Sequence, residues 1–197
     1  MFKEDYFING DTCAIVSDFD HYGKEYSIVF ERGRRIIVLK PPNKIVKDSY
    51  IFRGFPMEGA QIGARFLLKR RKDVPIVYSI NPGIILIRCM TADRRGTVWL
   101  VNSQILDFEP YHKARTTKIQ FHGGHNLIVG ITSGRLQKRR QEGSFLQLLV
   151  SDRLDIKKTQ KIFYEESNNS SLVSEKRTEY FIKEEILNEK QLDYEVT

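Results

Sequence analysis

The chain lacks the features that mark several common classes of protein. It has two cysteines, Cys13 and Cys89, which stand far apart and outside any metal-binding or redox motif. Two are too few for a disulfide framework and favour a reducing compartment. No apolar run approaches the length of a membrane-spanning helix, since the run Ile84–Ile87 stops at Arg88. The amino terminus lacks the apolar stretch of a signal peptide. We therefore expect a cytoplasmic protein that makes no membrane contact.

The residue groupings that catalysis or metal binding needs are also missing. Asp18 and Asp20 lie close together but have no complementary base, and no serine lies in a nucleophile elbow. The two histidines of the stretch 122–125 flank a pair of glycines and have no Cys or acidic residue nearby, so a hairpin tip explains them better than a zinc site. We predict no enzyme, no metal and no cofactor.

Positive charge is concentrated in the middle of the chain. Residues 32–140 contain 22 Lys and Arg but only 6 Asp and Glu, whereas residues 1–31 and 141–197 both carry net negative charge. An excess of this size calls for an anionic partner, and nucleic acid is the commonest one. A solvated surface explains a single basic cluster, but three clusters in one segment favour a nucleic-acid interface.

The candidate DNA-contacting residues are the three basic clusters and two further arginines. The guanidinium group suits this role because its planar fork donates two hydrogen bonds to a phosphate or to a guanine edge. Trp99, the only tryptophan, is explained either by a place in the core or by base stacking. The candidates are Arg53, Arg65, Lys69, Arg70, Arg71, Lys72, Arg94, Arg95, Lys138, Arg139 and Arg140.

The apolar pattern predicts an α+β fold with a predominantly antiparallel β-sheet core, a few short helices and a C-terminal amphipathic helix. Residues 43–53 favour a short helix, and the three-glycine segment 54–63 reads as a loop. Ser133 is suited to cap a further helix, which Gly143 would weaken. The expected strands cover residues 6–8, 13–16, 26–30, 36–39, 64–68, 76–80, 84–90, 98–101, 118–121 and 126–131, with hairpin turns at Asn9-Gly10, Gly33 and Gly123-Gly124.

The length of 197 residues supports one domain with an appendage. We predict a DNA-binding domain over residues 1–160 and an acidic linker and helix over residues 161–197. Within the second part, residues 165–174 have the composition of a linker. Residues 175–190 place apolar side chains at helical spacing among acidic ones, as in an amphipathic helix that docks on this domain or on a partner.

Several segments, in a consistent order over about residues 6–150, resemble the ComK family of competence transcription factors. The glycine spacing Gly54-x4-Gly59-x3-Gly63 is similar to that family's glycine-and-aromatic segment. The stretch from Arg94 to Leu100 is similar to its Arg-Pro-x-Cys-x-Trp-Ile stretch, with Arg95 and Thr97 in place of its Pro and Cys. Residues 117–133 are similar to its next hairpin and entry into a helix.

The resemblance implies a DNA-binding transcriptional activator that establishes competence for transformation. It implies recognition of paired AT-rich boxes in double-stranded promoter DNA, action as a homo-oligomer, a nucleoid-associated location in the cytoplasm, contact with RNA polymerase, and regulation by an adaptor and protease. A narrow minor groove attracts inserted arginines, so Arg94 and Arg95 are candidates for reading it, and the other clusters for holding phosphates. The alternatives are a non-specific nucleic-acid or RNA-binding module and an enzyme that acts on an acidic substrate.

Overall fold

The computed structural model of the chain describes residues 2–111 and 115–170. The chain divides into two compact units, Met1–Asp152 and Arg153–Thr197. The sheets, the two short helices and both hollows described below belong to the first unit. The expected division between a domain at 1–160 and a tail at 161–197 stays a prediction.

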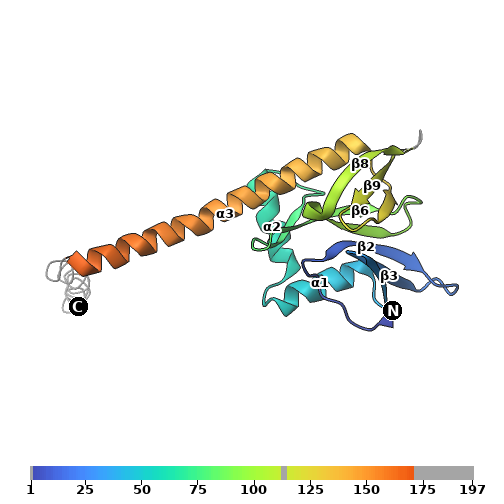
Figure 1. Ribbon diagram of the computed structural model, residues 1–197, viewed down its shortest axis with the longest axis horizontal. Helices are drawn as coiled ribbons and strands as arrows, with labels where there is room; N and C mark the ends of the chain where they lie inside the picture. The colour runs from blue at the N-terminus through green and yellow to red at the C-terminus, as the bar shows by residue number, and fades with distance from the viewer. Residues whose placement is uncertain (1, 112–114, 171–197) are drawn as a thin grey trace, which may run out of the picture. The chain divides into compact units, whose positions relative to one another are not determined.

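Two β-sheets form the frame of the first unit (Figure 1). The larger has seven strands in the order β1-β4-β3-β2-β7-β6-β5, and the smaller has three in the order β10-β9-β8. All neighbouring strands run antiparallel except β1 and β4, which are parallel. The strands are β1 Phe2–Lys3, β2 Thr12–Phe19, β3 Glu25–Glu31, β4 Arg34–Val38, β5 Ile76–Ser79, β6 Ile84–Met90, β7 Thr97–Val101, β8 Ile105–Tyr111, β9 Thr116–Phe121 and β10 Asn126–Val129.

Three helices complete the described chain: α1 Pro42–Phe52, α2 Met57–Leu68 and α3 Ser133–Ser170, with a short 3-10 turn at Asn102–Gln104. Side chains from α1, α2 and α3 pack with one face of the seven-stranded sheet in a first core. The opposite face packs against the three-stranded sheet in a second core, which includes Leu136 at the start of α3. Because both faces of the central strands are covered, β6 reads as a continuous apolar run rather than an alternating one.

The predicted α+β class, the α1 helix, and the hairpins at Gly33 and at Gly123-Gly124 are confirmed. Trp99 is 3% exposed and its indole N–H donates to the Asn43 side-chain oxygen at 3.0 Å, so it belongs to the core. The linker expected from residue 165 was wrong over residues 165–170, because the helix that begins at Ser133 extends over 38 residues and includes them. The amphipathic helix expected at 175–190 lies outside the described residues.

The glycine-rich segment was predicted wrongly as a loop followed by a strand at 64–68. It forms α2 instead, with Gly59 and Gly63 inside the helix. A Cβ atom at either glycine would meet nothing within 4 Å, so the glycines leave an open helix face and do not make a turn. Only Gly54 has the positive φ, +88°, that a turn after α1 requires.

The amino-terminal hairpin was also predicted wrongly, because residues 6–8 form no strand and β2 pairs with β3 and β7 instead. The segment is held by polar bonds to other elements. Tyr6 donates its hydroxyl hydrogen to the buried carboxylate of Glu31 at 2.8 Å, and the Ile8 amide donates to the Ser49 hydroxyl at 3.1 Å. Side-chain hydrogen bonds therefore replace the strand ladder that the alternation suggested.

Candidate nucleic-acid interface

An arginine-lined hollow of about 650 Å³ lies where the end of β6, the β6–β7 turn, the end of β10 and the start of α3 meet. Five arginines and a single carboxylate, that of Asp73, line it together with short polar and apolar side chains. The arginines come from parts of the chain up to 51 residues apart, so the fold assembles the hollow. We call it the arginine hollow; its arginines are Arg88, Arg94, Arg115, Arg135 and Arg139.

Close backbone packing sets the shape of this hollow. The Gly130 amide donates to the Met90 carbonyl at 2.9 Å, and a Cβ at Gly130 would stand 2.5 Å from the Thr91 carbonyl oxygen. Only glycine therefore lets the chain after β10 run this close to the end of β6. Thr91 also holds the β6–β7 turn, since its carbonyl accepts from the Arg94 amide at 2.9 Å and its hydroxyl accepts from the Gly96 amide at 3.0 Å.

Helix α3 begins beside the hollow. The sequence predicted Ser133 as the cap, but Ser133 is the first helical residue and Thr132 is the cap. The Thr132 carbonyl accepts from the Leu136 amide at 2.9 Å, and its hydroxyl accepts from the Arg135 amide at 3.4 Å. The free amide groups of the first helical turn carry partial positive charge. This charge adds to that of Arg135 and Arg139, which lie one turn apart on the helix.

The ion pairs leave most of this positive charge uncompensated. Arg139 pairs with Asp73, at 3.2 Å between guanidinium and carboxylate, and also donates to the Arg88 carbonyl. Among the side chains that the structure describes, those of residues 3–111 and 115–153, none forms an ion pair with Arg88, Arg94, Arg115 or Arg135. Five guanidinium groups thus face one carboxylate.

The fold brings residues of two of the three predicted basic clusters into the hollow and ends the first cluster next to a residue that lines it. Asp73 follows directly after Lys72, Arg94 lines the hollow, and Arg139 comes from the third cluster. Of the first cluster, Lys72 alone adjoins a lining residue in the sequence, and its side chain is exposed. Three arginines of the hollow were not among the sequence candidates: Arg88, Arg115 and Arg135. None of them belongs to a basic run, and all three line the hollow because the fold brings the end of β6, the start of β9 and the start of α3 to it.

Four of the predicted contact residues make side-chain hydrogen bonds within the protein. Arg70 makes a two-oxygen contact with Glu142 at 2.5 and 2.7 Å, which ties the chain after α2 to α3. Arg140 donates to the Asn102 side chain and to the Ile105 carbonyl, and partial burial lowers its pKa. Arg139 is bound as described above. The fourth, Arg53, lies in a different part of the molecule.

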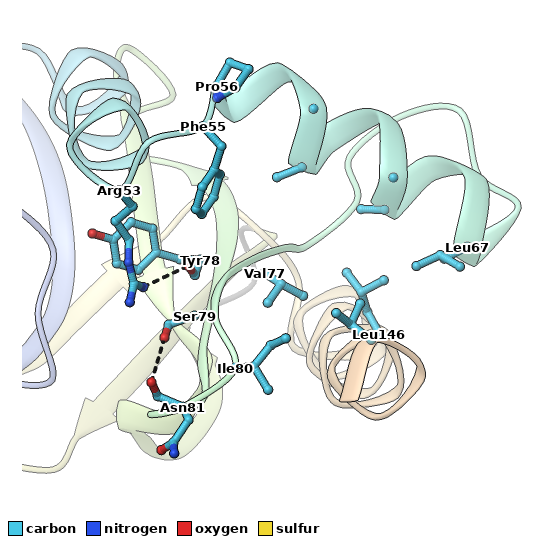
Figure 2. Close-up of a pocket in the computed structure, with 15 residues that line it drawn as sticks. Arg53, Phe55, Pro56, Leu67, Val77, Tyr78, Ser79, Ile80, Asn81 and Leu146 are labelled. Atoms are coloured by element: carbon cyan, nitrogen blue, oxygen red, sulfur yellow. Dashed lines mark hydrogen bonds between the residues drawn. The ribbon is translucent and has the colours of Figure 1, made fainter. Parts of the chain in front are cut away.

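Arg53 lines a second, apolar pocket of about 680 Å³ between α2, β5 and α3 (Figure 2). Its guanidinium donates to the Tyr78 carbonyl at 3.0 Å and lies 4.8 Å from the centre of the Tyr78 ring. No acidic residue lines this pocket in the described part of the chain. Of the remaining candidates, Arg65 and Lys69 are exposed at the end of α2, Lys138 is exposed on α3, and Arg95 is exposed beside Asp93.

The described residues offer little to a metal site, a membrane crossing or a reactive thiol. No group of three or more His, Cys, Asp or Glu residues is placed to hold a metal ion there. None of the helices described is long and apolar enough for a membrane crossing. Both cysteines are buried with free thiols, and burial raises the pKa of each to about 11.

Comparison with known proteins identifies the family. The family model described as ComK protein matches residues 3–155, and the chain therefore belongs to the ComK family, which is known for competence transcription factors and not for enzymes. The resemblance drawn from the sequence is confirmed. No curated protein and no solved structure gives a significant match.

Proposed function

We propose that this protein is a sequence-specific DNA-binding activator of competence genes that recognises AT-rich boxes in promoter DNA. Membership of the ComK family supplies the class of protein. The observation that carries the proposal is the arginine hollow, where five arginines from separate elements converge around one carboxylate. A site of this charge is suited to a polyanion.

Specificity for AT-rich DNA has a physical route in this architecture. A narrow minor groove concentrates negative potential and favours inserted arginines, and a projecting turn is one element that can carry an arginine into it. Arg95 has an 81% exposed side chain on the β6–β7 turn, and its one ion pair is a 3.7 Å contact with the neighbouring Asp93. We assign groove reading to this turn and backbone contact to the surrounding cations.

A titration of the whole chain with two duplexes of equal length tests this proposal. One duplex carries paired AT-rich boxes and the other is GC-rich, and both are measured by fluorescence anisotropy at the same salt concentration. We expect tighter binding of the AT-rich duplex. Equal dissociation constants would refute sequence-specific recognition and leave electrostatic binding alone.

The rival module that binds single strands by stacking is tested with single-stranded competitors. Trp99, the candidate for a stacking platform, is buried and hydrogen-bonded, so we expect single strands to displace the duplex poorly. Homo-oligomerisation, a cytoplasmic location at the nucleoid, contact with RNA polymerase and control by an adaptor and protease belong to the same proposal. Each follows from the family resemblance.

A further inference from the structure

We infer that the arginine hollow is a phosphate-binding site that holds the backbone of duplex DNA, and that Arg94 belongs to this site whereas its neighbour Arg95 does not. The inference rests on the proposed function and goes further, because it separates backbone contact from sequence reading within one turn. It also assigns DNA contact to three arginines that no basic cluster contains: Arg88, Arg115 and Arg135.

The concentrated positive charge of the arginine hollow is the first reason to infer phosphate binding. Like charges that converge in a hollow repel each other more strongly than the same charges spread over a flat surface, because low-dielectric walls concentrate the field. Asp73 lines the hollow, and its ion pair among the described side chains is with Arg139. The unpaired arginines favour a ligand that brings several negative charges, and successive phosphates of a nucleic-acid strand supply them.

The start of α3 is the second ground. Free amide groups at the amino end of a helix bind phosphate directly, and the helix dipole strengthens that contact. Thr132, the capping residue of this 38-residue helix, is itself part of the hollow's lining. Amide donors and guanidinium groups therefore face the same space, a combination that suits phosphate oxygens.

The concave shape of the hollow favours contact with the DNA backbone over contact with the bases. Base edges lie at the floor of a groove and are reached by an element that projects into it. A hollow instead accepts a convex ligand, and the sugar–phosphate strand is the convex part of a duplex. Arg94, which lines the hollow, therefore meets phosphate. Arg95, which does not line it and is largely exposed, is the residue of this turn that is free to enter a groove.

Backbone conformation keeps the two arginines apart. Arg94 has a left-handed conformation with φ of +62°, which turns the chain sharply between the two side chains. The Arg95 amide is held by the Asp93 carboxylate at 3.2 Å. The two neighbours are thus fixed in different directions and do not act as one basic pair.

The test measures how duplex affinity changes with salt between about 50 and 200 mM, for the full chain and its variants, on AT-rich and GC-rich duplexes. Arg88→Gln and Arg135→Gln are chosen because both side chains are exposed and make no ion pair within the described residues. We expect each to weaken binding to both duplexes about tenfold. Each should also reduce the slope of log K against log salt by about 0.9, the value of one lost phosphate contact.

Asp73→Asn is the complementary variant, because it removes the only carboxylate of the hollow and releases Arg139. Asn is well suited to the φ of +54° at this position. We expect tighter binding to both duplexes and a steeper salt slope. Arg35→Gln is the matched control: it removes an exposed arginine from β4, four strands away from β6 in the same sheet, and should leave the slope unchanged.

Arg94→Gln and Arg95→Gln test the division within the turn. The first should weaken both duplexes alike and lower the salt slope, and the second should reduce the preference for AT-rich DNA. Identical effects of the two would overturn the division. If the unmodified chain binds duplex but Arg88→Gln and Arg135→Gln leave the salt slope unchanged, the hollow does not contact the DNA backbone. The proposed function would stand in that case. Absence of duplex binding by the unmodified chain would overturn both.

A free polyphosphate is the other source of the same chemistry, and ATP serves as its probe. We expect ATP to compete with duplex only weakly, since it offers fewer phosphates than a strand. Micromolar binding of ATP that Arg135→Gln abolishes, with duplex affinity unchanged in that variant, would assign the hollow to a free nucleotide and overturn the inference.

Discussion

Two helical glycines should respond in opposite directions to the same substitution. Gly63 lies inside α2, where an added Cβ would meet nothing within 4 Å. Gly143 lies in α3 where the helix crosses β6, and an added Cβ would stand 2.9 Å from the Cγ2 atom of Ile85. Ile85 is 1% exposed and branched at Cβ, so it has little freedom to move away.

These contacts set the magnitudes. Alanine is favoured over glycine inside a helix by about 1 kcal/mol. Gly63→Ala should therefore raise the free energy of unfolding by about 1 kcal/mol, or roughly 2–4 °C in Tm. Gly143→Ala gains the same helix propensity but forces a methyl group into a packed contact, which costs about 1–3 kcal/mol. The net effect is a loss of up to about 2 kcal/mol.

Urea unfolding followed by circular dichroism measures both variants against the unmodified chain. The test bears on function, because the passage of α3 over β6 is what places Arg135 and Arg139 in the arginine hollow. Equal stabilisation by the two substitutions would show that α3 does not approach β6 as closely as the structure has it. Destabilisation by Gly63→Ala would contradict the open space that the structure shows beside Gly63 on α2.

Two further predictions concern polar groups inside the fold. Burial alone would raise the pKa of Glu31, but hydrogen bonds from Asn9, Tyr6 and Arg34 outweigh burial and lower the pKa. The ionised carboxylate therefore stabilises the folded protein above the ordinary pKa of a carboxyl group. This stabilisation is lost as the pH falls through the lowered pKa of the folded state. Glu31→Gln should be less stable than the unmodified chain at pH 7, with the difference in unfolding free energy shrinking below about pH 4.5. Arg140→Gln should lower the free energy of unfolding by about 1–3 kcal/mol, since it removes charge-assisted hydrogen bonds to Asn102 and Ile105. The salt slope of DNA binding should be unchanged in that variant. A reduced slope would show that Arg140 contacts DNA.

Local patterns predicted the fold where turn chemistry and alternation agree. The hairpin of β9 and β10 follows from Gly123 and Gly124, whose φ angles of +107° and +83° suit glycine. The prediction failed at α2 because glycine is typical of turns, and this outweighed the helical spacing of the small residues Gly59, Ala60, Gly63 and Ala64, which face the apolar pocket. It failed at residues 6–8 because a buried polar contact with Glu31, distant in sequence, determines the conformation there.

The sequence predicted that the candidate site is basic, but it did not predict which arginines form it. Dense clusters such as Lys69–Lys72 and Arg94–Arg95 stand out in the sequence. Arg88 and Arg115 lie outside any basic run, and both line the hollow only because the fold brings the end of β6 and the start of β9 to it. The same holds for Arg140, whose intramolecular bonds depend on where α3 packs and not on its place in a basic run.

The central claim is that duplex DNA lies over the arginine hollow and the adjoining β6–β7 turn. Hydrogen exchange of the whole chain, measured by mass spectrometry with and without an AT-rich paired-box duplex, tests it most directly. We predict that the duplex slows exchange in residues 88–96 and 129–139 and leaves residues 57–67 of α2 unaffected. Slowing confined to α2, or no slowing in the first two segments at saturating DNA, would contradict the account.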